Sequence, residues 1–329
     1  LLPKSLSVME IIRNDYNFSF IPNHISFDCD LPLEIMDAYT ITKANDEQIK
    51  FLELHLNKLG YIVGNTNNLP YKVSYQLFQI PDETAQIIQI KTEPIDREDW
   101  KYYIVSHDND GVLLYKFQLA SNLLNQPIEF DIFNCDTHED EYIFGYTPDL
   151  VFRFFSDNDL TIQHIHDADD MQFLKDIYLK IYEIETEYED IYKSITLLNS
   201  LRYLPKYNEF KILGYFTVVE SLLTHKQTKT ETGDSLSRQI KTKVPLLLNR
   251  ISDGINYNKY FHEASEEKIW AKLYSYRSAL AHGSNVNFNG ELQVLKSPLE
   301  IHDFMIACVK KLLTHSLYEP KLVRDLKNC

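Results

Sequence analysis

Residues 173–201 decide the fold of the second half of the chain, and they read FLKDIYLKIYEIETEYEDIYKSITLLNSL. Apolar or aromatic residues fall at positions 173, 177, 181, 184, 188, 191, 195, 198 and 201, in steps of four and three. This near-heptad spacing predicts a helix of about 30 residues with one apolar seam. Pro205 ends it, because proline lacks the backbone N–H and clashes with the preceding turn. The seam is expected to form bundle core, or alternatively a contact with a second copy of the chain.

Four further helices are predicted downstream of this seam. They cover about residues 207–224, a segment starting near Ser235, 266–282 and 298–317, with a polar loop over 225–234. The expected core of the first of them is Phe210, Leu213, Val218, Leu222 and Leu223. Pro245 is expected to kink or end the helix that starts near Ser235. Five helices with short or polar connections predict an all-α bundle.

The first half of the chain is typical of β-structure. Runs at 71–78, 86–90 and 102–106 predict strands, and Asn109-Asp110-Gly111 before an apolar run predicts a hairpin turn. One helix is predicted over 46–59, capped by Asn45 and closed by Gly60. Residues 156–172 are polar and acidic and predict a linker or surface turn. The prediction is therefore an α+β protein, with a strand-rich domain at 1–168 and a helical domain at 169–329.

Charge is distributed unevenly along the 329 residues, whose formal net charge is −15 at pH 7. Residues 1–168 hold 11 Lys or Arg and 27 Asp or Glu, whereas residues 169–329 hold 22 and 21. An acidic surface repels phosphate backbones, so any contact with nucleic acid is expected in the second half. The acidic first half is then expected to act as a sensor, regulatory or partner-binding domain.

The cysteines and the missing motifs exclude several classes of protein. Cys29, Cys135, Cys308 and Cys329 are widely separated and form no CxxC, which favours a reducing compartment. No stretch approaches the roughly 18 apolar residues of a spanning helix, and no secretory signal is visible. Glycine-rich phosphate loops, a GxSxG elbow and HExxH are absent from the sequence. We expect a cytoplasmic protein without membrane contact or cofactor.

A compact motif lies near the C-terminus and reads Arg277-Ser278-Ala279-Leu280-Ala281-His282-Gly283. Gly283 occupies the position where a left-handed glycine stops a helix, so His282 lies at the helix end, where the dipole favours positive charge. On a regular helix a five-residue separation turns the Arg277 and His282 side chains about 140° apart. A helix cap is one interpretation of the motif, and a functional site is the other.

With the helix before it, this motif resembles the signature of HEPN-domain proteins, in particular their Apea-like branch. In that branch a helix carrying a glutamate followed by leucines precedes a polar loop and then the Arg/Ala/His-Gly segment. Here the earlier helix reads YFTVVESLL over residues 215–223 and contains Glu220. The resemblance covers about residues 200–315, with an extension toward residue 173. In the first half the similarity to this family is faint and is confined to TKANDEQ at 42–48, where the chain enters a helix.

The resemblance implies a metal-independent endoribonuclease of the kind found in phage defence or toxin systems. In the family reaction the ribose 2′-OH attacks the adjacent phosphorus, leaving 2′,3′-cyclic phosphate and 5′-OH ends. Arg277 and His282 would be catalytic, and Glu220 would position Arg277 through an ion pair. One motif supplies a single histidine, whereas a symmetric dimer would supply both a base and an acid, and the resemblance also implies a homodimer with the two motifs at its interface.

Two alternatives remain open at this stage. Many active family members carry Asn, Asp or His directly after the arginine, whereas this chain has Ser278. A catalytically inactive HEPN-like module that binds RNA or a partner protein is therefore the first alternative. The second is a toxin whose acidic domain masks its own site. In each case a phage-derived or host trigger could act on the first domain.

Several residues near the motif are candidates for RNA contact. Tyr274 and Tyr276 flank it and could stack on bases, with Ser278 beside them. Arg238 and Lys241 belong to the most basic stretch, which also holds Lys226, Lys229 and Lys243. The competing interpretations are core packing for the tyrosines and a solvated loop for the cations.

Two acidic segments invite a metal assignment. His164-Ile165-His166-Asp167 is followed by Asp169 and Asp170, and His-x-His suits two ligands on one side of a strand. No third ligand stands at a firm spacing, so the sequence favours an acidic turn. Residues 135–141 likewise favour a solvated acidic loop, because they lack the ligand order and glycine of an EF-hand. No metal site is predicted.

Overall fold

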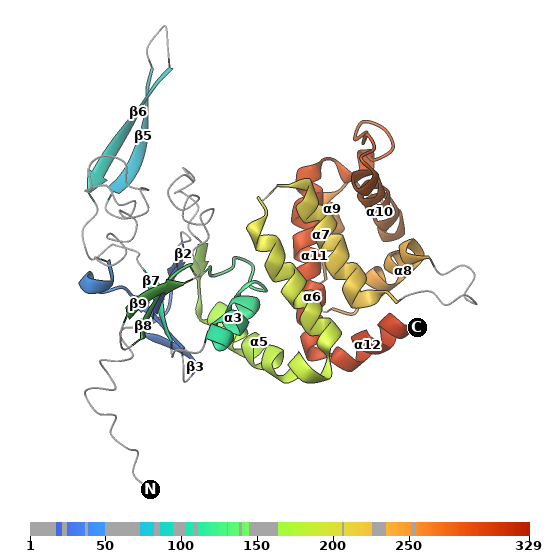
Figure 1. The fold of residues 1–329 in the computed structure, drawn as a ribbon. Helices are drawn as coiled ribbons and strands as arrows, with labels where there is room; N and C mark the ends of the chain where they lie inside the picture. Colours follow the sequence, from blue (N-terminus) through green and yellow to red (C-terminus); the bar gives the residue numbers. More distant parts are fainter. Residues whose placement is uncertain are drawn as a thin grey trace. The chain divides into compact units, whose positions relative to one another are not determined.

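The computed structural model describes residues 18–21, 25–36, 39–49, 73–81, 86–94, 103–107, 111–129, 131–137, 140–144, 164–205, 207–225, 235–251 and 254–329. The chain forms two compact units, residues 1–115 with 128–175 and residues 116–127 with 176–329. The first unit holds the strands and the second holds most of the helices (Figure 1). The predicted α+β class, strand-rich first and helical after it, is confirmed.

The first unit is built on a six-stranded sheet whose order is β3-β4-β7-β1-β8-β9. Its strands, joined in antiparallel pairs, are β3 (Leu33–Met36), β4 (Tyr39–Lys43), β7 (Tyr103–His107), β1 (Phe18–Phe20), β8 (Asp131–Thr137) and β9 (Asp140–Phe144). Ile104 and Val105 of the central strand β7 are both fully buried, as expected for a strand covered on both faces. The buried Ser19 hydroxyl lies 3.2 Å from Nε2 of His107 and satisfies both polar groups.

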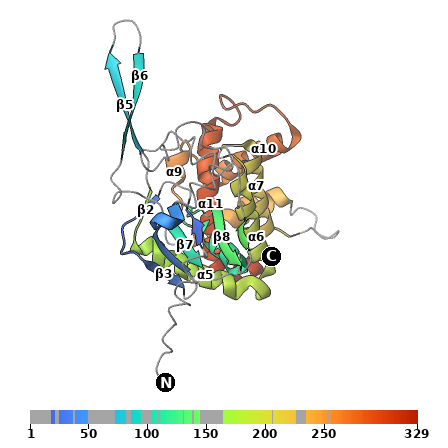
Figure 2. The same ribbon diagram turned by 60° about the vertical axis from the view of Figure 1, so that its left-hand side comes forward.

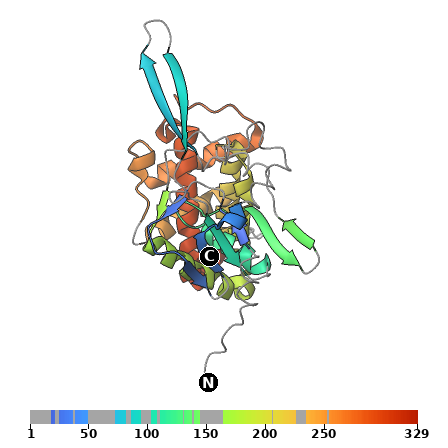
Figure 3. The ribbon, with the colours of Figure 1, turned by 90° about the vertical axis from the view of Figure 1, so that its left-hand side faces the viewer.

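Two smaller sheets also belong to the described part of the first unit. Strands β5 (Val73–Pro81) and β6 (Gln86–Pro94) pair antiparallel as a narrow ribbon, drawn in cyan in Figure 3. Strand β2 (Ile25–Phe27) pairs in parallel with β10 (His164–His166). The strands predicted at 71–78, 86–90 and 102–106 are confirmed, within a few residues at each end.

The helix predicted from residue 46 begins where expected. The Asn45 side chain accepts a hydrogen bond from the Gln48 backbone N–H, and the Gln48 side chain accepts one from the Asn45 N–H, both at 2.9 Å. This reciprocal pair is a capping box, and it satisfies two backbone donors that a helix start leaves unpaired. The part of this helix predicted beyond residue 49, with Gly60, lies outside the described residues.

Three local predictions for the first half are wrong. Gly111 does not close a hairpin; it begins helix α3 (Gly111–Ser121). Phe117, Leu119 and Ala120 of that helix are all buried, and a continuous apolar run does not distinguish a buried helix from a strand. The expected acidic loop at 135–141 contains the end of β8 and the start of β9. The expected turn at 156–172 contains β10 and the start of α5.

The second unit is a helical bundle whose elements are best followed in Figures 1 and 2. Its helices are α5 (Ala168–Glu187), α6 (Glu189–Ser200), α7 (Glu209–Leu223), α8 (Leu236–Leu248), α9 (Tyr257–Tyr260), α10 (Glu266–His282), α11 (Pro298–Tyr318) and α12 (Pro320–Asn328). Helix α5 begins at Ala168, where the sequence changes to helical periodicity, and it runs from the first unit into the second. The four helices predicted after the seam are present, whereas α9 and α12 were not predicted.

The apolar seam at 173–201 is bundle core, but it is carried by two helices. Ile181, Ile184, Ile191 and Ile195 are each buried within the chain. The helix breaks at Tyr188, whose φ of −127° and ψ of 56° are not helical. Arg324 of α12 stacks over the Tyr188 ring and donates a hydrogen bond to the Glu187 carbonyl, which the broken helix leaves exposed. A contact from the far end of the chain thus supports the break.

Helix α11 is the centre of the bundle and packs against α6, α7, α8, α9 and α12. Its fully buried residues are Ile301, Phe304, Met305, Cys308, Val309 and Leu312. Val218, Leu222 and Leu223 of α7 are buried as predicted, but Phe210 is 71% exposed and Leu213 is half-buried. Helix α8 passes through Pro245 and ends three residues later at Leu248, so the proline does not end it.

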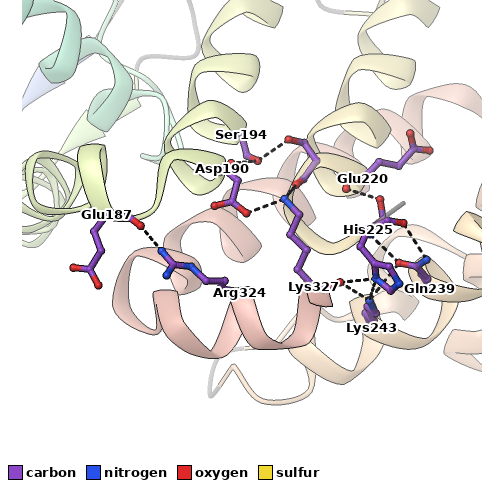
Figure 4. Close-up of polar contacts among 11 residues, drawn as sticks. Glu187, Asp190, Ser194, Glu220, His225, Gln239, Lys243, Arg324 and Lys327 are labelled. Atoms are coloured by element: carbon purple, nitrogen blue, oxygen red, sulfur yellow. Dashed lines mark hydrogen bonds and ion pairs between the residues drawn. The ribbon is translucent and has the colours of Figure 1, made fainter. Parts of the chain in front are cut away.

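Lys327 near the C-terminus joins four helices (Figure 4). Its Nζ donates hydrogen bonds of 2.8 Å to the Asp190 carboxylate on α6 and to the Ser221 carbonyl on α7. Its carbonyl accepts from Nζ of Lys243 on α8, at 3.0 Å, and from Nδ1 of His225, at 2.8 Å. These bonds fasten α12 to the bundle and satisfy carbonyls at helix ends. Across the described ranges, no helix has both the length and the apolar character that crossing a membrane demands.

Candidate active site at the end of helix α10

Helix α10 carries the arginine–histidine motif, and both of its ends are defined by local hydrogen bonds. The Ser265 side chain accepts from the Lys268 N–H at the start. At the end, Gly283 is left-handed, with φ 65° and ψ 27°, and the Ser284 N–H bonds the Ala279 carbonyl at 2.9 Å. This is a Schellman termination, which uses a conformation that glycine adopts without a Cβ clash. The predicted glycine stop after His282 is confirmed.

Arg277 forms an ion pair with Glu220 on the neighbouring helix α7. Nη2 of Arg277 lies 3.2 Å from Oε1 and 3.3 Å from Oε2 of Glu220. The side chains are partly buried, with 28% of Arg277 and 17% of Glu220 exposed, so water screens the pair only in part. Glu220 was predicted to position Arg277 through an ion pair, and the two side chains do meet.

Among the described residues, the guanidinium of Arg277 is anchored through one nitrogen, Nη2. Arginine carries five N–H donors. Within the described part of the chain, buried Nε has no hydrogen-bond partner, and no bond or ion pair reaches Nη1. The Tyr274 ring lies beside the group, 5.8 Å from its carbon. Arg277 is therefore held through Nη2, and Nη1 keeps its donors for an anion, whereas the buried Nε is not accessible to one.

His282 is the last residue of α10 and is exposed to solvent. Among the described residues it makes no hydrogen bond or ion pair with Arg277. Helix geometry accounts for this, because a five-residue step rotates the side chain by about 140° and advances it by about 7.5 Å. One chain thus presents the arginine and the histidine on different sides of the same helix end.

The structure separates the two tyrosines proposed to contact RNA. Tyr274 is half-buried and keeps an accessible surface beside Arg277. Tyr276 is completely buried and packs against Phe288 at 5.5 Å between ring centroids. Burial raises the pKa of Tyr276 to about 12. The prediction that Tyr276 stacks on bases is corrected, because its ring belongs to the core.

The remaining candidates lie around this helix end. Ser278 is half-buried next to Arg277. Arg238 is exposed and Lys241 is half-buried on α8, which packs against α10. Lys226 and Lys229 lie outside the described residues. Arg238 and Lys241 thus belong to a helix that packs against the motif helix.

A second group of residues was considered for a metal site from the sequence and assigned to an acidic turn instead. His164 and His166 lie on strand β10, and Asp170 lies in the first turn of α5. One potential ligand atom from each of the three lies within 4.8 Å of the others. The sequence feature that could have identified this group is the four-residue spacing from His166 to Asp170. It was not recognised because the segment was assigned to a turn, whereas it joins a strand to a helix.

The helix end of α10 can therefore bind a phosphate through an anchored guanidinium and can move one proton through an exposed imidazole. In a single chain these two functions point in different directions. Comparisons with models of protein families, with curated proteins and with solved structures yielded no match to this chain.

Proposed function

We propose that the protein is an endoribonuclease of the HEPN type, acting in phage defence or as a toxin, with Arg277 and His282 as its catalytic residues. The observation that carries the proposal is the Arg277–Glu220 ion pair at 3.2 Å, which joins the two helices of the family resemblance. A partly buried carboxylate that holds an arginine while leaving donors free is suited to phosphate recognition.

The chemistry follows from these side chains. A base takes the proton of a ribose 2′-OH, and the oxygen attacks the adjacent phosphorus. The bond from phosphorus to the 5′-oxygen breaks, and an acid protonates the leaving oxygen. The products are a 2′,3′-cyclic phosphate and a 5′-OH, and no water or redox partner is consumed. Arg277 would neutralise charge that develops on the non-bridging oxygens, and the imidazole of His282 would transfer a proton.

A single chain offers one exposed His282 for two proton transfers, and that histidine lies on a different side of the helix from Arg277. A two-fold dimer that brings two α10 ends together would supply a base, an acid and two guanidinium groups to one groove. We therefore propose a homodimeric active unit, with RNA bound across the pair of motifs.

The test is cleavage of an unstructured RNA by the full chain in the presence of EDTA, with the product ends mapped chemically. Arg277→Ala and His282→Ala should each lose at least about 100-fold in rate, the magnitude seen when a transition-state donor is removed. Lys272→Ala is the matched control, because Lys272 lies on the same helix in an exposed pair with Glu291. Cleavage that survives both motif substitutions would overturn the assignment.

The dimer has its own test. Wild-type protein is mixed with an equal amount of His282→Ala and allowed to exchange subunits. If each site needs both histidines, only wild-type homodimers are active. The mixture should then retain about a quarter of the activity of the same total amount of wild-type protein. Independent sites would instead retain about half of the activity. Full activity of a monomer would refute the composite site.

A second candidate function is an RNA- or partner-binding module without catalysis. Ser278 follows the arginine, and the Glu220 carboxylate already neutralises part of the Arg277 charge. The same assay separates the two candidates, because a binding module retains RNA in a mobility-shift experiment without cleaving it.

For the acidic first half we propose a regulatory role, with a phage-derived or host trigger as its ligand. The charge asymmetry between the halves supports this division, since an acidic unit is poorly suited to hold RNA. Cleavage by the full chain should then rise when the trigger is added. If extracts from infected cells leave the RNA cleavage rate unchanged, the regulatory role is contradicted.

A further inference from the structure

Strand β10 orients its residues in an unusual way. Its two histidines lie at positions i and i+2, so both project to the same face. His166 is fully buried and His164 is 36% exposed, whereas Ile165 between them is 58% exposed. Burying the polar His166 ring while exposing an isoleucine is unfavourable for packing alone. The strand is thus arranged to hold imidazoles inward.

Asp170 meets both histidines. Its Oδ2 lies 2.9 Å from Nδ1 of His166 and 3.5 Å from Nε2 of His164. The two imidazole rings are close to one another, with 4.6 Å between centroids. Bonds of about 2.0–2.2 Å at tetrahedral angles place the ligand atoms of a zinc ion about 3.4 Å apart. The two distances from Asp170 lie on either side of that value, and all three ligand atoms lie within 4.8 Å of one another.

The surrounding structure fixes the three side chains. Parallel pairing of β10 with β2 sets His166 opposite Phe27, whose ring stacks on the imidazole with 5.7 Å between centroids. Tyr103 packs edge-on against Phe27 at 4.9 Å. The Asp167 side chain accepts the Asp170 N–H at 2.9 Å and holds the first turn of α5. A supporting shell of this kind orients metal ligands.

Two further observations concern the ligand set. Nδ1 of His166 faces Asp170, whereas buried Nε2 of the same ring has no hydrogen-bond partner within the described residues, so Nδ1 is the atom that could share a cation with the carboxylate. The segment 164–170 also carries three aspartates, Asp167, Asp169 and Asp170, and no basic side chain other than the histidines.

We propose that His164, His166 and Asp170 form a binding site for one divalent metal ion of the zinc class. Two imidazoles and a carboxylate are a ligand set that suits Zn²⁺. Three protein ligands leave one tetrahedral position open to water or an anionic ligand. The site lies in the first unit and is independent of the proposed ribonuclease chemistry, which uses no metal.

The experiment uses the full chain after a chelator has removed any bound metal and the chelator itself has been removed by dialysis. Zn²⁺ alone is titrated in competition with a chromogenic chelator, and Co²⁺ is used as a spectroscopic probe. The wild type should bind one ion per chain. His164→Ala and Asp170→Asn should each weaken binding by at least about tenfold, since loss of outer-shell partners alone costs 10–100-fold.

Both substituted side chains are partly exposed, so these variants should fold; circular dichroism checks this. Asp169→Asn is the matched control for charge, because Asp169 is exposed and outside the cluster. His262→Ala, at an exposed histidine of the second unit, is the control for a lost imidazole. Wild-type-like affinity in His164→Ala and Asp170→Asn, or no Zn²⁺ binding by the wild type, would overturn the site. Arg277→Ala should bind Zn²⁺ normally, so the two proposals fail separately.

Discussion

Nη2 of Arg277 lies between the two carboxylate oxygens of Glu220, 3.2 Å from Oε1 and 3.3 Å from Oε2, although the residues are 57 positions apart. The pair bridges α10 and α7 at the helix end that carries the motif. The contribution of this ion pair to stability depends on its partial burial, because a fully exposed ion pair contributes little and is screened by salt.

Glu220→Ala and Arg277→Ala should each lower the free energy of unfolding by about 1–2 kcal/mol, because each leaves a partly buried charge unpaired. The double variant should lose less than the sum, with a coupling of about 1 kcal/mol. Urea denaturation of the four proteins measures it. The exposed pair Lys272–Glu291, at 3.5 Å, is the control and should show almost no coupling. Strict additivity at Arg277 and Glu220 would contradict the interaction.

Gly283→Ala should destabilise the protein by about 1 kcal/mol and displace His282, because an alanine Cβ is strained at the observed φ of 65°. No atom lies within 4 Å of the added Cβ among the described residues, so the cost is conformational. Gly254→Ala is the control. Gly254 has no positive φ, and an added Cβ would lie 3.7 Å from its nearest atoms, an ordinary van der Waals distance. Equal thermal stability of the two variants would argue against the left-handed termination.

Tyr276→Phe should leave stability unchanged or raise it, because the buried hydroxyl has no hydrogen-bond partner within the described part of the chain. RNA cleavage should also be unchanged. Tyr274→Ala should weaken RNA binding by about 1–3 kcal/mol if its accessible ring stacks on a base, and Tyr274→Phe should retain binding. Fluorescence anisotropy with a short RNA compares the three. Loss of binding in Tyr276→Phe would restore that residue to the site.

Lys327→Met should destabilise the bundle by about 2 kcal/mol at neutral pH, since hydrogen bonds to Asp190 and to the Ser221 carbonyl are lost; the 40% exposure of Asp190 limits its share. Burial raises the pKa of Asp190, but the hydrogen bond and charge of Lys327 outweigh it and leave that pKa below its ordinary value of 3.8. A depressed folded-state pKa contributes stability above the unfolded value and loses it as pH falls.

The stability difference between wild type and Lys327→Met should therefore shrink below about pH 3.8 and be constant above about pH 5. Lys321→Met on the same helix is the control, because Lys321 is exposed. Chemical denaturation across this pH range supplies the measurement. A difference that persists unchanged at low pH would mean that the Asp190 contact contributes nothing.

The ends of several elements were readable from the sequence because helix ends and capping boxes are made within a few residues. Gly283 stops α10, Ser235 begins α8, and Asn45 and Gln48 cap each other, all as their residue types predict. Apolar periodicity likewise located the bundle. Periodicity could not reveal the break at Tyr188, which depends on Arg324 of a distant helix.

The sequence by itself determined the class of fold, most helix boundaries and the residue types of the motif, since these follow from hydrogen bonds and apolar spacing along a few turns of chain. Tertiary structure decided which of those residues can act. In the folded chain Tyr276 is buried, and Arg277 forms an ion pair with Glu220 but lies on a different side of its helix from His282. Asp170 lies within hydrogen-bond distance of His164 and His166. Those outcomes depend on packing and on the direction in which each helix and strand presents its side chains, which local patterns do not specify.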